Sequence, residues 1–167
     1  GLGDGLATSI GLGGEGAIGP GRTGPTSTER NAPTLWNVAY RGALFWDGRS
    51  PSLEEQALEP MRSPIERGLD PEEAAARVAA VPEYVELLRA AVPDEVEPVT
   101  PTALARALAA VQRTFVTRRA PYDQYVRGDA GALDEETQLG MSLFAEAGCA
   151  SCHVPPLFAA DHFAARG

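Results

Sequence analysis

Two cysteines and an adjacent histidine near the end of the chain are the residues best suited to chemistry. They lie in the segment Cys149–His153, whose sequence is Cys-Ala-Ser-Cys-His. This spacing is the attachment pattern of c-type haem. The thiols of Cys149 and Cys152 can add to the haem vinyl groups, and the imidazole of His153 can then bind the iron from one face. The segment therefore predicts covalently bound haem c with His153 as an iron ligand.

Three other interpretations of this segment use the same residues less well. A structural zinc site needs four ligands, whereas the chain holds two cysteines and two histidines, and His153 follows Cys152 directly. A thioredoxin-like dithiol would need a βαβ context, which the pattern lacks. A disulfide between Cys149 and Cys152 is sterically allowed but gives His153 no role. Haem attachment is the interpretation that uses all three side chains.

The residues between position 50 and this segment predict helices that would position it. Residues suited to N-capping precede four helical patterns: Ser52, Asp70, Thr100 and Asp134. The helix after Ser52 is expected to end at Pro60, because proline disrupts a helix interior, and a further helix is expected over residues 82–91. No alternating segment is long enough for a strand. We therefore predict an all-α fold.

Two of these helices carry additional signals. The helix after Thr100 has one apolar stripe, formed by Leu104, Leu108, Val111 and Phe115. The helix after Asp134 should extend to Ala147 and stop at Gly148, directly before Cys149, so that it braces the attachment loop. Pro121 and the glycines of residues 128–131 predict a linker or turn, and the helical run breaks near residues 118–122.

The start of the chain and its composition limit the class of protein. Residues 1–30 hold ten of the 18 glycines, which predicts a long loop of the kind that can line a cofactor. A formal net charge of −9 argues against a nucleic-acid partner, and no apolar run is long enough to span a bilayer. The chain begins at Gly1 without a signal sequence, so we expect that any export signal has been removed or was never part of this sequence.

Several further motifs occur in a fixed order along the chain. They are Arg30–Asn37, Phe45–Arg49, Leu53–Ala57, Pro60–Glu66, Tyr122-Asp123, Gly128-Asp129, Ala132-Leu133 and the haem motif itself. This series resembles bacterial dihaem cytochrome c peroxidases and their MauG relatives over nearly the whole chain. The ordered series is far more specific than the Cys149–His153 pattern alone.

The resemblance implies two cytochrome c-like domains, built of helices and loops around haem c, with one haem in each. Residues 1–120 would be most of the N-terminal, peroxidatic domain, and the first Cys-X-X-Cys-His motif would lie before Gly1. Residues 121–167 would begin the C-terminal, electron-transfer domain, which carries the motif at Cys149–His153. The full-length protein would then hold two haems, and this chain alone is not expected to be active.

The resemblance also implies roles for three residues of the first domain. Glu66 would exchange protons with hydrogen peroxide, work to which a carboxylate is suited, although a lone glutamate beside Arg67 is ordinarily a solvated surface residue. Gln56 would orient the peroxide or its water, or else is a surface residue of a glutamate-rich helix. Trp46 would relay electrons between the two haems, and it could equally be a core residue.

Two other positions concern the loop at the start of the chain. Asn31 corresponds to a calcium ligand, and oxygen ligands suit calcium, but asparagine is also a common turn residue.

Many relatives carry a histidine in the glycine-rich loop that caps the peroxidatic haem. Here Ser9–Gly11 is followed by Leu12, and residues 1–30 contain no histidine. This departure puts a histidine-capped resting state in doubt.

The function implied is a periplasmic c-type haem peroxidase that reduces hydrogen peroxide with electrons from a small cytochrome c or cupredoxin. Covalent haem attachment outside the cytoplasm sets the compartment, and a homodimer is compatible with the full-length protein. One alternative is a MauG-like haem oxidase acting on a partner protein. Another is a simple electron-transfer cytochrome, which would have no use for Glu66 and Gln56.

Overall fold

The computed structural model describes residues 30, 32–159 and 163. These residues form six α-helices and two short 3₁₀ helices, and within them the only β-type pairing is an isolated bridge between Leu44 and Ser50. The all-α prediction is confirmed. Leu12 and Asn31 lie outside the described residues.

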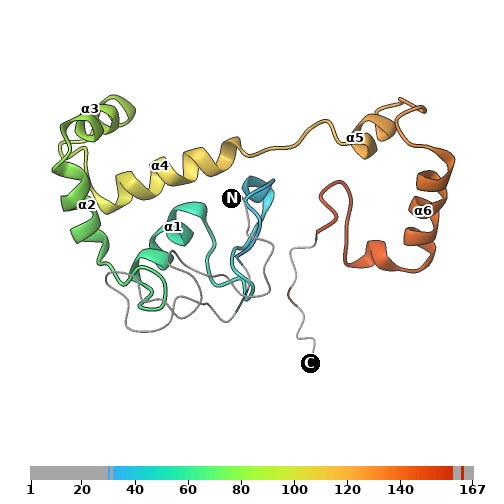
Figure 1. Ribbon diagram of the computed structural model, residues 1–167, viewed down its shortest axis with the longest axis horizontal. Coiled ribbons are helices and arrows are strands. Elements are labelled where there is room, and N and C mark those ends of the chain that lie inside the picture. Colours follow the sequence, from blue (N-terminus) through green and yellow to red (C-terminus); the bar gives the residue numbers. More distant parts are fainter. Residues whose placement is uncertain (1–29, 31, 160–162, 164–167) are drawn as a thin grey trace, which may run out of the picture. The chain divides into compact units, whose positions relative to one another are not determined.

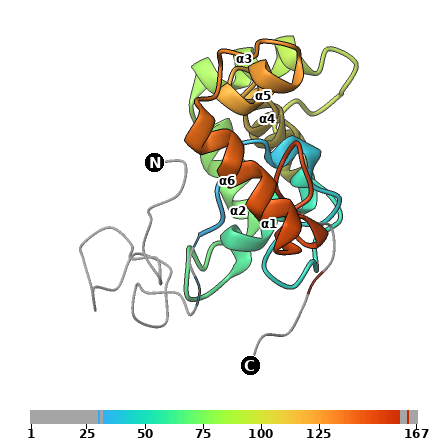
Figure 2. The same cartoon turned by 90° about the vertical axis from the view of Figure 1, so that its right-hand side faces the viewer.

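The chain divides into two compact units, Gly1–Phe115 and Val116–Gly167, which Figures 1 and 2 show with their helices labelled. The first unit contains η1 (Val38–Tyr40), α1 (Leu53–Arg62), α2 (Pro71–Ala79), α3 (Pro82–Ala91) and α4 (Pro101–Thr114). The second unit contains α5 (Pro121–Val126), α6 (Glu135–Glu146) and η2 (Cys149–Ser151). The functional domain boundary expected at residues 120/121 stays a prediction.

Four helices begin where the sequence predicts, because a side-chain oxygen accepts a hydrogen bond from a free N–H group of the first turn. The N–H groups of Glu55 and Ala103 donate to the hydroxyls of Ser52 and Thr100, each at 3.1 Å. In the same way Asp70 and Asp134 accept from the N–H groups of Glu72 and Thr137, each at 2.8 Å. The hydrogen bonds from Thr137 also hold the pKa of the Asp134 carboxyl below its ordinary value.

The prediction that Pro60 ends α1 is wrong. The helix continues to Arg62, and the N–H of Ser63 still donates to the carbonyl of Glu59 at 3.0 Å. Proline removes one N–H donor from the helical ladder, but the helix continues past position 60 because later N–H groups, such as that of Ser63, still reach their carbonyl partners. The linker expected at Pro121 is also partly wrong, because Pro121 opens the short helix α5 as its first residue.

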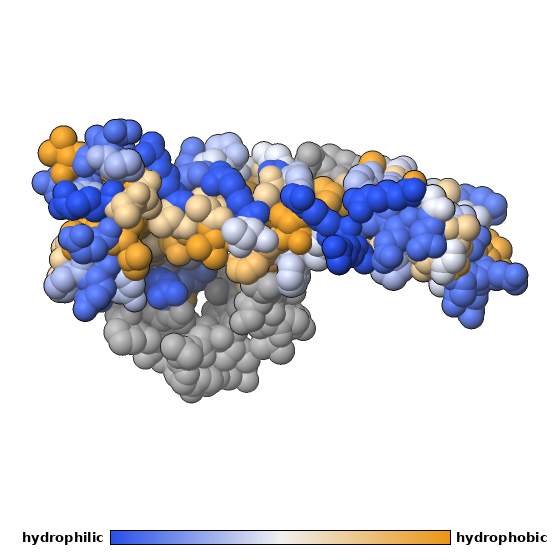
Figure 3. All heavy atoms as spheres, turned by 90° about the horizontal axis from the view of Figure 1, so that it is seen from above, coloured by the Kyte–Doolittle hydropathy of each residue, from blue (hydrophilic) through white to orange (hydrophobic). Residues whose placement is uncertain are grey.

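The core of the first unit lies where α1 packs against α4, as Figure 1 shows. Ala109 of α4 is completely buried there, in a cluster with Val38, Leu44 and Leu53. An alanine at the contact lets two helices approach closely. The apolar stripe of α4 is not the buried face: Leu108 and Val111 remain 43% and 56% exposed. Figure 3 accordingly shows apolar surface over the part of this unit that holds α3 and α4.

A charge pair also joins these two helices. The guanidinium of Arg113 on α4 donates to both carboxylate oxygens of Glu54 on α1, at 2.7 and 3.0 Å. This bidentate geometry adds directional specificity to the helix packing. The hydrogen bond from Arg113 holds the pKa of the Glu54 carboxyl below its ordinary value. The pair therefore stabilises the fold at any pH above that ordinary pKa. This stabilisation is lost as the pH falls through the lowered pKa of the folded protein.

We expect Ala109→Leu to lower the free energy of unfolding by about 1–3 kcal/mol, because the added methyl groups must push α1 and α4 apart. Denaturant titration followed by circular dichroism measures this change. Ala110→Leu is the matched control, since Ala110 is the next residue of the same helix and is exposed; it should change the value by less than about 0.5 kcal/mol. Equal effects of the two substitutions would contradict the observed packing.

Candidate functional site

The segment Cys149–His153 begins at a sharp turn at the end of α6. Ala147 is the C-cap of α6, and the next residue, Gly148, has a φ of 78°, in the left-handed region that glycine adopts most readily. The carbonyl of Gly148 accepts hydrogen bonds from both the N–H and the hydroxyl of Ser151, at 3.1 and 2.7 Å. The turn therefore fixes how α6 leads into η2, which carries the first cysteine.

The two cysteines are free thiols on one helical turn. Cys149 is exposed and Cys152 is half-buried, and the N–H of His153 donates to the carbonyl of Cys149 at 2.9 Å. Among the described residues, no group of three or more histidine, cysteine, aspartate or glutamate side chains could hold a metal ion. The zinc interpretation therefore lacks its ligand set in this part of the chain.

The imidazole of His153 is oriented by a backbone carbonyl. Its Nδ1 lies 3.1 Å from the carbonyl oxygen of Phe158, to which a protonated Nδ1 donates. The neutral ring then carries its lone pair on Nε2, which is the atom that binds a metal. This is the tautomer that an axial haem ligand needs.

The described residues of the second unit bury few side chains against one another. Among its described residues only Leu133 is classed as buried, while Leu139, Leu143 and Val154 are between 46% and 59% exposed. A haem buries a large apolar surface against such side chains. The free thiols, the oriented imidazole and this uncovered apolar surface all fit a covalently attached haem.

Glu66 lies in the turn after α1 and is half-buried. Backbone hydrogen bonds fold this turn back on the helix end: the N–H of Gly68 donates to the carbonyl of Ser63, and that of Leu69 to Met61, both at 2.8 Å. The carboxylate of Glu66 forms no hydrogen bond or ion pair with any described residue. The turn thus carries a half-buried glutamate on a backbone held by these hydrogen bonds.

Gln56 stands on α1 itself, one residue before the buried Ala57. Its side chain is half-buried, and within the described part of the chain its amide has no hydrogen-bond partner. The predicted site residues Gln56 and Glu66 therefore belong to one continuous element, a helix and the turn that closes it.

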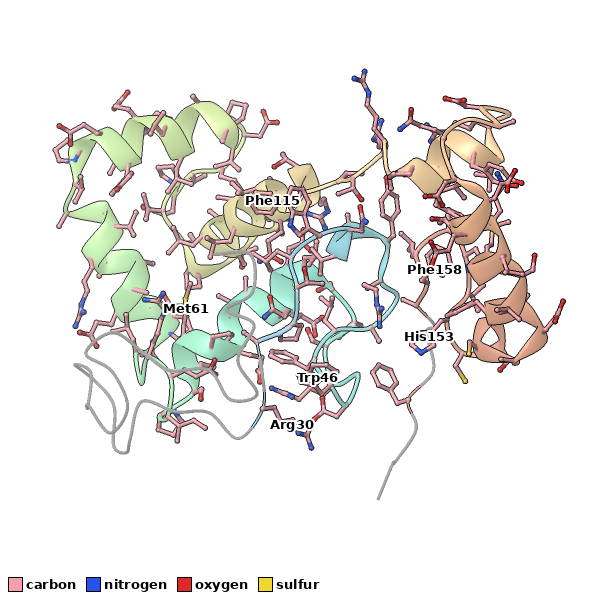
Figure 4. All side chains as sticks on the ribbon, turned by 45° about the vertical axis from the view of Figure 1, so that its right-hand side comes forward. Arg30, Trp46, Met61, Phe115, His153 and Phe158 are labelled. Atoms are coloured by element: carbon pink, nitrogen blue, oxygen red, sulfur yellow. The ribbon has the colours of Figure 1, made fainter. Side chains whose placement is uncertain are left out.

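Trp46, which is labelled in Figure 4, lies on a short loop whose ends are joined by the bridge between Leu44 and Ser50. The N–H of Leu44 donates to the carbonyl of Ser50 at 2.8 Å. Inside the loop the guanidinium of Arg49 binds both carboxylate oxygens of Asp47, at 2.9 and 3.1 Å, and lies 3.6 Å from the centre of the Phe45 ring. Trp46 is 55% exposed, so the described residues do not support a core role.

The charge pair in this loop shifts one pKa. Slight desolvation raises the pKa of the Asp47 carboxyl, but hydrogen bonds and the positive charge of Arg49 outweigh it, so the pKa lies below its ordinary value. Asp47 therefore stays ionised and keeps its contact with Arg49 at neutral pH. The sequence predicted neither the contact between Asp47 and Arg49 nor the role of the Phe158 carbonyl. Asn31, the predicted calcium ligand, lies outside the described residues.

An all-helical chain with an oriented histidine after two spaced thiols has the features of c-type cytochromes. Within that class, the family model described as di-haem cytochrome c peroxidase matches residues 1–131. The chain therefore belongs to the di-haem cytochrome c peroxidase family, as its motifs indicate, and haem c is the cofactor of that family.

Individual relatives agree with this assignment. Cytochrome c551 peroxidase of Pseudomonas aeruginosa is 38% identical over 124 residues, which cover 74% of this chain and 36% of that protein. The methylamine utilization protein MauG of Methylorubrum extorquens is 36% identical over 161 residues, covering 96% and 42%. A crystal structure of a MauG-like protein associated with microbial copper homeostasis superposes with a TM-score of 0.74 at 30% identity, covering 96% of this chain and 46% of that one. The chain thus spans less than half the length of these relatives.

We expect Gly148→Ala to destabilise the second unit by about 1–2 kcal/mol, because alanine is strained at this positive φ. No atom lies within 4 Å of the added Cβ, so the cost is conformational alone. Gly140→Ala is the matched control: it also meets open space but lies inside α6, where alanine should stabilise by about 0.5–1 kcal/mol. Thermal unfolding measures both, and a stabilising effect of Gly148→Ala would contradict the left-handed turn.

Proposed function

We propose that this chain is part of a periplasmic c-type haem peroxidase that reduces hydrogen peroxide to water with electrons from a small redox protein. The observation that carries the proposal is Glu66, a half-buried carboxylate without a described partner on a turn fixed to α1. Family membership gives it a chemical context. The proposal assigns residues 1–120 to a peroxidatic domain and residues 121–167 to an electron-transfer domain.

Cys149, Cys152 and His153 would hold one of the two haems of the full-length protein. Bound there, the haem supplies an iron centre that accepts and passes on electrons. The cysteines fix its position covalently, and His153 offers Nε2 while Nδ1 is held by the Phe158 carbonyl. Because haem c is attached outside the cytoplasm, this site also supports the periplasmic location.

Glu66 would act as a general acid–base group. Its carboxylate takes a proton from one peroxide oxygen and returns it to the oxygen that leaves as water. The turn between Ser63 and Leu69 limits how far the carboxylate can move. Gln56, on the same element, would orient the peroxide through its amide, which can both donate and accept hydrogen bonds.

Electrons would reach the peroxidatic site through Trp46, whose loop is locked by Asp47 and Arg49. The donor would be a small cytochrome c or cupredoxin. With its net charge of −9, the chain favours a basic donor, since complementary charge accelerates encounter. A calcium ion bound by Asn31 and a homodimeric full-length protein are further parts of the proposal.

A MauG-like oxidase acting on a partner protein is the second candidate. It is supported by the 36% identity with MauG over 161 residues and by the likeness to a MauG-like structure. Glu66 and Gln56 serve either enzyme, because both begin with peroxide chemistry at a haem. An electron-transfer cytochrome is less well supported, since it leaves these two side chains without a role.

The first test concerns haem attachment. Expressed with a haem c maturation system, the 167-residue chain should carry one covalent haem that resists acid–acetone extraction. Cys149→Ala should weaken or abolish the attachment, whereas Ser151→Ala, between the two cysteines, should preserve it. Pyridine haemochrome spectra and intact mass measure the stoichiometry. Two haems, or zinc in place of haem, would overturn this assignment.

The second test concerns Glu66 in the full-length protein. Glu66→Gln keeps the shape of the side chain but removes the proton acceptor, so peroxide turnover should fall by about 10²–10⁴-fold. Stopped-flow reduction of the C-terminal haem by an electron donor should be unchanged. Glu55→Gln, at an exposed position of α1, is the control and should retain full turnover. Equal loss of turnover and of haem reduction would show that Glu66 is structural.

A further inference from the structure

Phe158 supplies the carbonyl that orients His153, and it does so from a strained backbone. Figure 4 labels both residues in the segment that follows η2. The φ of Phe158 is 51°, in the left-handed region that aromatic residues rarely adopt. A single hydrogen bond to an exposed imidazole, at 3.1 Å, is a weak reason for a bulky residue to keep this conformation. Other contacts must hold Phe158 in place.

Two aromatic rings from different helices supply those contacts. Tyr122 of α5 meets the ring of Phe158 edge-to-face, with centroids 4.8 Å apart and planes at 73°. Phe144 of α6 meets it at 5.9 Å and 79°, and the same ring also lies 6.2 Å from the imidazole of His153 at 61°. Edge-to-face packing is the favoured geometry of aromatic pairs. The Phe158 ring is thus clamped between α5 and α6.

We propose that Tyr122 and Phe144 are positioning residues for His153: by clamping the Phe158 ring they hold its carbonyl at Nδ1 and so set the reduction potential of the haem bound through His153. The inference rests on the haem-attachment part of the proposed function and is independent of peroxide chemistry. It links Tyr122 of α5, which lies 27 residues before Cys149 in the sequence, to the electronic state of the iron.

The direction of the effect follows from ligand basicity. A hydrogen bond from Nδ1–H to a carbonyl makes Nε2 a stronger electron donor. A stronger donor stabilises ferric iron more than ferrous iron, which lowers the reduction potential. When the clamp is loosened, the carbonyl leaves Nδ1 for part of the time, and the potential rises. Exposing the haem to water would shift the potential the other way, because water favours the more highly charged ferric state.

The experiment compares Tyr122→Leu and Phe144→Leu with Tyr122→Phe in the full-length, haem-loaded protein. Tyr122→Phe keeps the ring and removes only the hydroxyl, so it is the matched control. Spectroelectrochemical titration gives the midpoint potential of the C-terminal haem, and ¹⁵N-histidine NMR of the reduced protein gives the solvent exchange rate of the His153 Nδ1–H. Neither measurement requires peroxide turnover, so a failure of the peroxidase proposal would not affect them.

Both leucine variants should raise the potential and speed Nδ1–H exchange by about 5–10-fold, as expected for the loss of one hydrogen bond's net stabilisation, while Tyr122→Phe stays at the wild-type values. An unchanged or lowered potential in both leucine variants, or an equal shift in Tyr122→Phe, would overturn the inference.

Phe158→Gly provides an independent check if a leucine variant fails to load haem. Glycine adopts the same φ without strain but offers no ring to clamp, so faster exchange and a higher potential are again expected, and wild-type values would overturn the inference.

Discussion

The close packing of α1 against α4 is the constraint on which the rest of the first unit depends. Ala109 is completely buried between these helices, in one cluster with Leu44 and Leu53. Leu53 opens α1, which carries Gln56 and leads into the turn of Glu66, and Leu44 begins the loop of Trp46. One small side chain at a helix contact therefore helps to fix the backbone from which Trp46, Gln56 and Glu66 project.

Much of this architecture could be predicted from local residue types. The caps at Ser52, Asp70, Thr100 and Asp134 were predictable because a short oxygen-bearing side chain before a helix satisfies groups that have no other partner. The extent of α1 was not, because Pro60 removes a single N–H donor while the N–H of Ser63 still bonds to the carbonyl of Glu59 beyond it. The face of α4 that is buried could not be predicted either. Its leucine stripe has the stronger apolar pattern, yet the alanine face is the one that can approach α1.

Only part of the candidate site could be predicted from the sequence. Cys149–His153 could be found from spacing, since attachment chemistry requires those residue types in that order. The partner of the imidazole could not, because a backbone carbonyl has no residue-type signature, and the left-handed φ of Phe158 is unexpected for an aromatic residue. The lock between Asp47 and Arg49 could have been suspected from two opposite charges flanking a glycine, but its stacking on Phe45 depends on the turn of the loop.

Glu54 and Glu66 have different surroundings among the described residues, and the difference bears on the acid–base role proposed for Glu66. Glu54 is held by both nitrogens of Arg113, and its pKa is lowered by that bond, so it stays ionised and reinforces the packing of α1 on α4. A group in such a pair resists taking up a proton during a reaction cycle. Glu66 has no cation at ion-pair distance within the described residues. The proton exchange proposed for Glu66 would therefore break no ion pair or hydrogen bond among the described residues.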